Sequence, residues 1–388
     1  MIHGSSKQGK TSLRKYNLGA DDHALVQCSN KWDLAGLHAA ILKTIGFKIT
    51  ESEERSTGGK QKIRAAFSGK IFGSGGEAEA SAEKTSGTRV IEKRLDIDLS
   101  DVNDIIKSLD TVGFKKIIAL EDFHYLPADT QRDFSVALKA FHEASKITFI
   151  ITGVWLEENR LITLNGDLTG RVVSVNADKW SEDELHQVIN DGQQFLNIEF
   201  AEPFRSSIVS EASESVYIVQ EACREACESA GVTRKVAGSP ATVGAGLVAS
   251  NVVEEIVNQQ SARFNSFVIN FAAGFQDTRL EMYKWILFPV LRAEISRLQR
   301  GLRFDWIRRS IQSKHPEGKG LNVGNITQAL QAAASLQIKK NITPLILDYD
   351  QSNLRLDVVD RGFLLWLKYQ DRDHLLENAG FDLEGLDT

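Results

Sequence analysis

The sequence predicts an α/β protein: a core with a parallel sheet, followed by an α-helical region and a winged-helix domain. Three observations lead to this prediction. Residues 4–12 form a glycine-rich loop that opens a helix, and residues 117–122 form an apolar strand that ends in two carboxylates. Residues 276–388 then arrange helices around a single hairpin. A glycine-rich loop followed by buried strands and helices in alternation is typical of α/β domains.

The loop matches the phosphate-binding pattern G-x-x-x-x-G-K-[ST] at every fixed position. Its residues are Gly4, Ser5, Ser6, Lys7, Gln8, Gly9, Lys10 and Thr11, and Ser12 follows. Gly4 and Gly9 let backbone N–H groups turn toward phosphate oxygens. Lys10 is expected to reach the β- and γ-phosphates, and the Thr11 hydroxyl to ligate Mg²⁺. A helix over residues 10–16 adds a positive N-terminal dipole. ATP and Mg²⁺ are therefore the predicted ligands.

The strand before this loop is reduced to Met1, Ile2 and His3. A buried strand usually has about five residues. Either residues are missing upstream of Met1, or the first strand is unusually short.

Composition sets limits on the class of protein. The 388 residues predict two or three domains. A net charge of −6 argues against a chain that coats nucleic acid nonspecifically. Three cysteines give no disulfide framework. No run approaches the roughly 18 apolar residues of a membrane span, so a cytoplasmic location is expected.

The acid pair Glu121 and Asp122 ends a strand that should lie beside the phosphate-binding loop. One carboxylate can hold the Mg²⁺ shell while the other polarises the attacking water. We assign Glu121 to Mg²⁺ and the shorter Asp122 to the base. In the alternative, Asp122 holds the metal and His124 is the nearest base. Either arrangement predicts slow hydrolysis of ATP.

The rest of the core is read from apolar periodicity. Strands are expected at 24–29, 147–155 and 172–175, and helices at 33–45, 101–109 (with Ser100 as the N-cap) and 131–144. Residues 50–88 form a polar, glycine-rich insertion with hairpin-like pieces. It is either a flexible surface loop or a contact for a neighbouring subunit or effector. Thr152 is either a γ-phosphate sensor or a strand cap. Arg171 is the first candidate for a transition-state arginine, and Arg160 the second.

The C-terminal half begins with a capping box, Ser181 with Glu184. Helices are expected at 182–196, 215–230 and 252–260, with a small-residue connector at 237–249. A longer pattern over 279–299 is kinked or divided by Pro289. Helices at 306–313 and 325–336, a hairpin of 342–347 with 354–359, and a helix at 361–369 complete a winged-helix layout. Asp348 and Asp350 place acids at the hairpin tip, so DNA binding is not favoured.

The ordered motifs resemble those of AAA+ and STAND ATPases, in particular the archaeal-type, origin-recognition-like members. The features that carry the resemblance are the phosphate-binding loop, the Ile-Ala-Leu-Glu-Asp-Phe-His strand end, the Thr152-Gly153 strand end and the Gly170-Arg171 pair. The resemblance implies an ATPase core at 1–178, a helical lid at 179–275 and a winged helix at 276–388. It also implies ATP binding with Mg²⁺ and a change of oligomeric state.

We therefore expect a slowly hydrolysing ATP switch that rearranges its domains and self-associates. Its setting would be bacterial defence or signalling, through an effector protein that the sequence does not identify. One alternative is a DNA-transaction AAA+ ATPase, such as a regulator of replication or transposition. Another is a nucleotide-binding scaffold without significant turnover.

Overall fold

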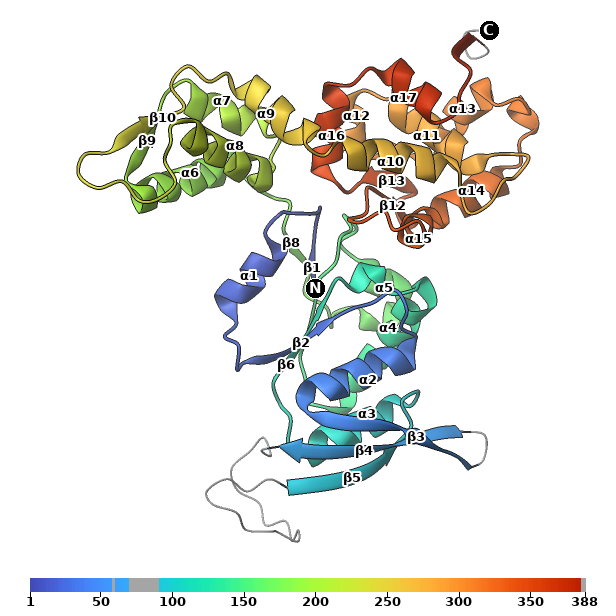
Figure 1. The fold of residues 1–388 in the computed structure, drawn as a ribbon. Coiled ribbons are helices and arrows are strands. Elements are labelled where there is room, and N and C mark those ends of the chain that lie inside the picture. The colour runs from blue at the N-terminus through green and yellow to red at the C-terminus, as the bar shows by residue number, and fades with distance from the viewer. Residues whose placement is uncertain (58–59, 70–90, 385–388) are drawn as a thin grey trace. The chain divides into compact units, whose positions relative to one another are not determined.

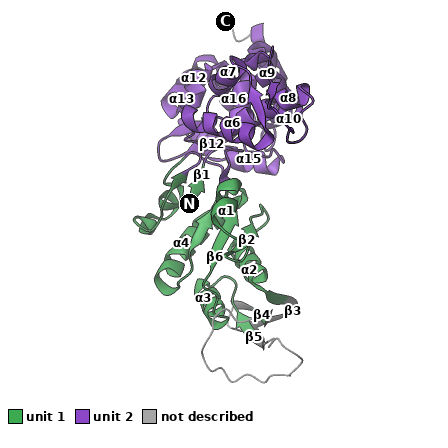
Figure 2. Cartoon of the chain, turned by 90° about the vertical axis from the view of Figure 1, so that its left-hand side faces the viewer, with its two compact units in different colours: residues 1–3, 11–153, 157–175 green, residues 4–10, 154–156, 176–388 purple. Residues whose placement is uncertain are grey.

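The computed structural model describes residues 1–57, 60–69 and 91–384. It forms two compact units, which Figure 2 distinguishes by colour. Unit 1 contains residues 1–3, 11–153 and 157–175, and unit 2 contains residues 4–10, 154–156 and 176–388. The predicted α/β class is confirmed. No helix within the described ranges is both long and apolar enough to cross a membrane.

Unit 1 is built on a parallel sheet with the strand order β2-β6-β7. These strands are β2 (His23–Gln27), β6 (Ile117–Glu121) and β7 (Phe149–Ile151). The middle residues of β6 are almost fully buried, as expected for a strand covered on both faces. A bridge joins Ile2 of β1 (Ile2–His3) to Thr152, and the N–H of Val175 donates to the carbonyl of Met1. The first strand is thus short, with only two residues.

Helices accompany this sheet: α1 (Lys10–Asn17), α2 (Leu34–Ile45), α3 (Val102–Thr111), α4 (Ala128–Ala144) and α5 (Arg160–Leu164) (Figure 1). Helix α2 begins where expected, because the Asp33 side chain accepts a hydrogen bond from the Gly36 N–H. The predicted N-cap of α3 was wrong by one residue. Asp101, rather than Ser100, accepts from the Asn103 N–H.

The first part of the 50–88 insertion belongs to an antiparallel sheet of order β3-β4-β5. Its strands are β3 (Phe47–Thr57), β4 (Lys60–Gly69) and β5 (Ile91–Ile97). Phe47 and Phe67 face each other across β3 and β4 with ring centroids 5.1 Å apart. The predicted hairpin is therefore present. The predicted alternating piece at 70–73 lies outside the described residues.

Unit 2 shares one apolar core that runs from Leu185 to Phe381. Its first helices are α6 (Glu182–Leu196), α7 (Phe204–Glu211), α8 (Val216–Ser229), α9 (Ala249–Asn258) and α10 (Ser261–Ala272). The capping box of Ser181 and Glu184 is confirmed. The expected connector at 237–249 contains a strand, β10 (Ala241–Val243), which pairs in parallel with β9 (Ile198–Phe200).

The last part of unit 2 has the predicted winged-helix layout. Its helices are α11 (Met282–Arg292), α12 (Ile295–Gln299), α13 (Phe304–Lys314), α14 (Val323–Gln331), α15 (Ala333–Lys339), α16 (Arg361–Lys368) and α17 (Arg372–Asn378). Strands β11 (Leu302–Arg303), β13 (Arg355–Val358) and β12 (Leu347–Asp350) form its sheet in that order. Pro289 lies inside α11, and the predicted helix over 325–336 is divided between α14 and α15.

The predicted acidic hairpin tip is wrong. Asp348 and Asp350 lie within β12, opposite Asp357 and Arg355 of β13, and both are buried. Asp350 accepts hydrogen bonds from the N–H groups of Ser352 and Asn353, which form the turn. The alternation of the sequence placed the turn too early, because the polar residues of β12 look like loop residues. The sequence argument against DNA therefore loses its main observation.

Burial and the charges of Asp348 and Asp350 raise the pKa of Asp357 from 3.8 to about 7, although Arg355 lies 2.8 Å away and opposes the shift. The folded state thus keeps a proton that the unfolded chain loses above about pH 4. We expect the free energy of unfolding to fall as the pH rises from about 4 to about 7 and then to level off.

The substitution Asp357→Asn should remove much of this fall and stabilise the protein at pH 8 by about 1–3 kcal/mol. Denaturant titrations at pH 5 and pH 8 measure the difference. Exposed Asp382 provides the control, since Asp382→Asn should leave the pH dependence unchanged. A wild-type pH dependence in Asp357→Asn would contradict the expectation.

Candidate functional site

Three residues of the phosphate-binding loop have positive φ angles, a backbone conformation that favours glycine. The φ angles are 141° at Gly4, 61° at Lys7 and 83° at Gly9. A non-glycine residue in this region is uncommon, so Lys7 is held there by its surroundings. Helix α1 begins at Lys10, with Thr11 and Ser12 in its exposed first turn. The first four N–H groups of a helix have no intrahelical partner, which makes its start a binding site for anions.

Lys10 is folded back onto the loop and is buried. Its ammonium donates to the carbonyl of Gly4 at 2.9 Å and also to the carbonyl of Ser5. The loop itself thus holds the charged group in place before any ligand arrives. An ammonium has three donors and rotates freely about its stem, so it can exchange a carbonyl for a phosphate oxygen at little cost.

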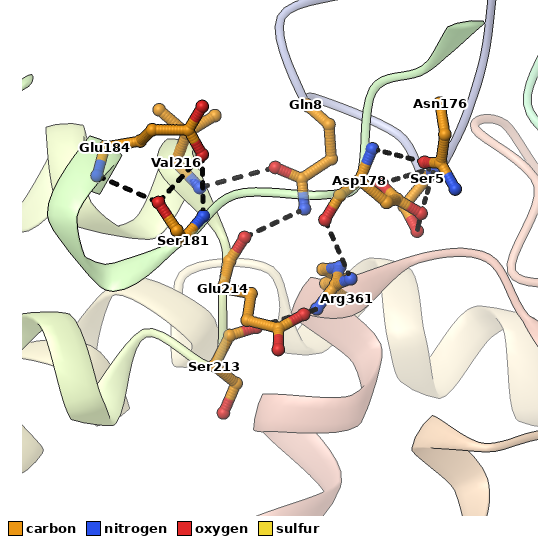
Figure 3. Close-up of polar contacts among 10 residues, drawn as sticks. All are labelled: Ser5, Gln8, Asn176, Asp178, Ser181, Glu184, Ser213, Glu214, Val216 and Arg361. Carbon is orange, nitrogen blue, oxygen red and sulfur yellow. Dashed lines mark hydrogen bonds and ion pairs between the residues drawn. The ribbon is translucent and has the colours of Figure 1, made fainter.

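Asp178 binds the first half of the loop. Both of its carboxylate oxygens lie 2.9 Å from the Ser5 nitrogen, and Oδ2 also accepts from the Ser5 hydroxyl at 2.7 Å (Figure 3). Ser5 therefore has both of its donors on Asp178. A Cβ at Gly4 would lie 3.1 Å from the same carboxylate. The first glycine of the motif is needed here for the approach of a protein carboxylate.

Three further contacts hold the loop within unit 2. The N–H of Ser6 donates to the Val359 carbonyl at 3.1 Å. The Gln8 side chain accepts from the Val216 N–H at 3.3 Å and donates to the Glu214 carbonyl at 3.5 Å (Figure 3). The Lys7 ammonium lies 3.9 Å from the centre of the Tyr217 ring. The non-glycine residues of the loop are thus committed to protein groups.

In unit 1, Glu121 lies at the end of β6 and is nearly buried. The Arg14 Nε is 2.6 Å from its Oε1, and the Thr11 hydroxyl is 3.3 Å from its Oε2. Because this ion pair is shielded from water, its partners restrict the carboxylate strongly. The structure therefore brings together Thr11 and Glu121, the two residues that the sequence assigns to Mg²⁺.

The donor set at this point fits magnesium. Mg²⁺ prefers oxygen ligands at about 2.0–2.1 Å in octahedral geometry, which places neighbouring ligands about 2.9 Å apart. The hydroxyl of Thr11 and the carboxylate of Glu121 are close to that separation. Within the described residues no group of three His, Cys, Asp or Glu side chains could hold a metal. Mg²⁺ needs no such group, since phosphates and waters complete its shell.

Asp122 follows β6 in the left-handed conformation, with a φ of 55°. Its carboxylate accepts a hydrogen bond from the Gln27 side chain, at the end of the neighbouring strand β2. Such a conformation costs about 1–3 kcal/mol and is found often at functional sites. The carboxylates of Asp122 and Glu121 thus have different hydrogen-bond partners.

Thr152 follows β7 at the same edge of the sheet. Its N–H donates to the Leu120 carbonyl at 2.8 Å, and its carbonyl accepts from the Phe123 N–H at 3.0 Å. Its hydroxyl is buried and has no hydrogen-bond partner among the described residues. An unpaired buried hydroxyl costs stability, so Thr152 stays the candidate for a γ-phosphate sensor.

Cys28 lies one residue beyond β2, and its N–H donates to the Glu121 carbonyl at 2.9 Å. Burial and the neighbouring charge of Asp122 raise the pKa of its thiol to about 12. The thiol is therefore protonated at neutral pH. We exclude Cys28 as a nucleophile for this reason.

Arg171 is exposed and already engaged within unit 1. Its guanidinium lies 3.1 Å from the Glu143 carboxylate and donates to the Asp167 carbonyl at 2.5 Å. Arg160, the second candidate, begins helix α5. Both stay predictions as transition-state arginines.

Sequence reasoning missed four residues of this region: Arg14, Gln27, Asp178 and Arg361. The sequence gives a weak signal for Arg14, because it lies one helical turn after Lys10 and could therefore lie on the same face of the helix as Lys10. Gln27 lies at the end of the strand that neighbours β6. Asp178 and Arg361 had no signal in the sequence, because their partners are far away along the chain. Asp178 lies 173 residues after Ser5, and Arg361 lies 183 residues after Asp178.

Comparisons with known proteins give similarity of fold only. No known family profile and no curated protein matches the sequence. Among solved structures, Cdc6p from Pyrobaculum aerophilum is 11% identical, with 97% of this chain and 86% of that chain covered and a TM-score of 0.39. The Aeropyrum pernix ORC1 protein in complex with DNA is 11% identical, with coverage of 97% and 85% and a TM-score of 0.43. RuvB from Thermotoga maritima is 13% identical, with coverage of 95% and 87% and a TM-score of 0.35.

The Aeropyrum pernix ORC2 protein, solved in its ADP form, also matches at 11% identity, with coverage of 98% and 86% and a TM-score of 0.37.

Proposed function

We propose that this protein binds ATP with Mg²⁺ and hydrolyses it slowly. The observation that carries the proposal is the pairing of Thr11 with Glu121 at 3.3 Å, directly after a loop that fits the phosphate-binding pattern. Chance matches to the loop pattern occur, but they do not bring a carboxylate from the end of a parallel strand to the motif hydroxyl. The test is ATP binding and turnover by the purified protein.

The residues then have separate tasks. Lys10 and the N–H groups of residues 8–12 bind the phosphates. Thr11 and Glu121 would hold Mg²⁺, which neutralises the charge of the β- and γ-phosphates when bound. Asp122 orients the attacking water and accepts its proton. Thr152 donates its hydroxyl to the γ-phosphate. We keep Arg171 as the candidate for charge stabilisation during transfer.

Slow turnover follows from the side chains at the end of β6. Asp122 is one methylene shorter than glutamate, and its left-handed backbone must be kept while it reaches the water. We expect a turnover below about 1 s⁻¹, at or below the low end for ordinary enzymes. Such a protein acts as a nucleotide-state switch. Size measurements with ADP and with a non-hydrolysable ATP analogue would show whether it self-associates in one state.

DNA is a second candidate partner, and one observation favours it. Residues 297–309, here called the arginine segment, contain five arginines and one aspartate. Arg297, Arg300, Arg303 and Arg309 are exposed, and Arg297 lies over the Trp306 ring at 4.8 Å. Exposed arginines beside an aromatic ring are typical of phosphate and base contacts. With Asp348 and Asp350 buried, the DNA-transaction alternative is better supported than an effector-only role.

The arginine segment gives a direct test of DNA binding. We expect Arg300→Ala/Arg303→Ala to weaken binding to duplex DNA to a similar degree for different sequences. The plot of log K against log salt concentration has a negative slope, and its magnitude should decrease by about 1–2. Each lost phosphate contact decreases the magnitude of the slope by about 0.9. Anisotropy titrations at several salt concentrations measure both quantities. The control is Lys107→Ala/Lys115→Ala, which removes the same amount of charge at exposed positions of unit 1.

The control pair should keep the wild-type slope. Equal slopes for all three proteins, or no binding by the wild type at low salt, would rule out the arginine segment as a DNA interface. The ATP proposal would stand in either case, since none of these residues belongs to the phosphate-binding loop.

A further inference from the structure

We infer that Asp178 is a positioning residue for ATP: it shapes the phosphate-binding loop without touching the nucleotide. The inference rests on the proposed ATP binding and adds a residue that the loop pattern does not contain. Asp178 lies two residues before Trp180, in the segment that leads into α6. Its carboxylate meets the loop at Ser5, whose position in the pattern can be any residue.

The geometry identifies a built contact. Asp178 is buried, and its own N–H donates to Asn176 Oδ1 at 2.8 Å. Its carboxylate receives the Ser5 N–H on both oxygens and the Ser5 hydroxyl on one. Hydrogen bonds to a charged acceptor are stronger than neutral ones. The first residue after Gly4 is therefore fixed in both position and direction.

Fixing Ser5 also fixes Lys10. The Lys10 ammonium donates to the carbonyls of Gly4 and Ser5. The Gly4 carbonyl belongs to the same peptide group as the Ser5 N–H that Asp178 holds, and the Ser5 carbonyl belongs to the next one. If this part of the loop moved, the carbonyls would no longer place the ammonium beside the start of α1. Asp178 thus acts on the phosphates through Ser5 and Lys10, and its loss should weaken nucleotide binding.

The same aspartate connects the loop to a C-terminal arginine (Figure 3). Arg361, the first residue of α16, donates to the Asp178 carbonyl at 3.5 Å and to the Ser213 carbonyl at 2.8 Å. Its guanidinium also lies 3.3 Å from the Glu214 carboxylate, and the Glu214 carbonyl accepts from Gln8. The support of the loop thus includes residues far along the chain.

The experiment compares Asp178→Ala, Asp178→Asn and Ser5→Ala with the wild type in MgATP binding and in steady-state turnover. We expect Asp178→Ala to raise the Kd for MgATP about 10- to 100-fold. Asp178→Asn keeps one acceptor and should recover part of the affinity. Ser5→Ala loses only the hydroxyl contact and should raise Kd by less than Asp178→Ala. KM should rise with Kd while kcat at saturating ATP stays near the wild-type value.

Asp183→Asn is the matched control, because Asp183 is exposed in the first turn of α6. A purely structural role for Asp178 would lower thermal stability and the active fraction without this split between KM and kcat. If Asp178→Ala does not fold, the graded pair Asp178→Asn and Ser5→Ala still decides the question.

Two results would overturn the inference while ATP binding itself is retained. One is an unchanged Kd in all three variants. The other is tighter binding in Asp178→Ala, which would make the carboxylate a competitor of the phosphates. The proposed function fails separately, if the wild-type protein does not bind MgATP at all.

Discussion

Replacing Lys10 with alanine is expected to abolish measurable ATP binding, with a loss of affinity of at least about 100-fold. The ammonium is the one point charge that the loop pattern directs at the β- and γ-phosphates, and hydrogen bonds to charged groups are worth about 1.5–3 kcal/mol each. Calorimetric titration with MgATP measures the loss directly. Thermal unfolding gives a second readout, because a ligand present at 100 times its Kd stabilises the folded state by about 2.7 kcal/mol.

Lys15 provides the control for this substitution. It lies on the same helix as Lys10 but is exposed, so Lys15→Ala removes an equal charge outside the loop. Lys15→Ala should bind ATP like the wild type and keep its stabilisation by ATP. Unchanged ATP affinity in Lys10→Ala would remove the basis of the nucleotide assignment.

The second large effect is expected for Asp122→Asn, which should lower turnover by about 100- to 10,000-fold. An amide keeps the hydrogen bond with Gln27 if it presents its oxygen, but it does not accept the proton of water. Affinity for MgATP should change by less than about threefold, because the proposed assignment gives the metal to Glu121 and not to Asp122. Single-turnover release of phosphate separates this chemical step from binding.

Glu121→Gln should behave differently, because Glu121 pairs with Thr11 and Arg14. We expect a higher Mg²⁺ requirement as well as slower turnover. Asp129→Asn, at an exposed position near the start of α4, tests for a general effect of lost charge and should be neutral. Wild-type turnover in Asp122→Asn would rule out Asp122 as the base; a higher Mg²⁺ requirement in Asp122→Asn would instead favour the alternative in which Asp122 holds the metal.

The part of the site that could be predicted from the sequence is the part encoded locally. The loop is nine consecutive residues, and Glu121 with Asp122 follow one apolar strand, so neither needs knowledge of the rest of the chain. The helices α1, α2 and α6 were predicted for the same reason. Their apolar spacing and their capping residues lie within a few positions of each other.

The rest depends on contacts between distant residues or on weak local signals. Strands β9 and β10 have three residues each, too few for an alternating pattern to emerge. The hairpin turn was placed too early because buried Asp348 and Asp350 are stabilised by strand pairing and turn hydrogen bonds that a sequence does not display. Asp178 lies in a polar stretch, and only the folded chain shows that its carboxylate faces Ser5.

Gly4 has a consequence for the engineering of this loop. Its missing side chain makes room for Asp178, and its φ of 141° suits glycine. A nine-residue graft of the loop onto another scaffold would leave the Ser5 N–H and hydroxyl without their acceptor. A transplant should therefore include an acidic residue placed as Asp178 is, and the minimal portable unit is a loop together with its carboxylate.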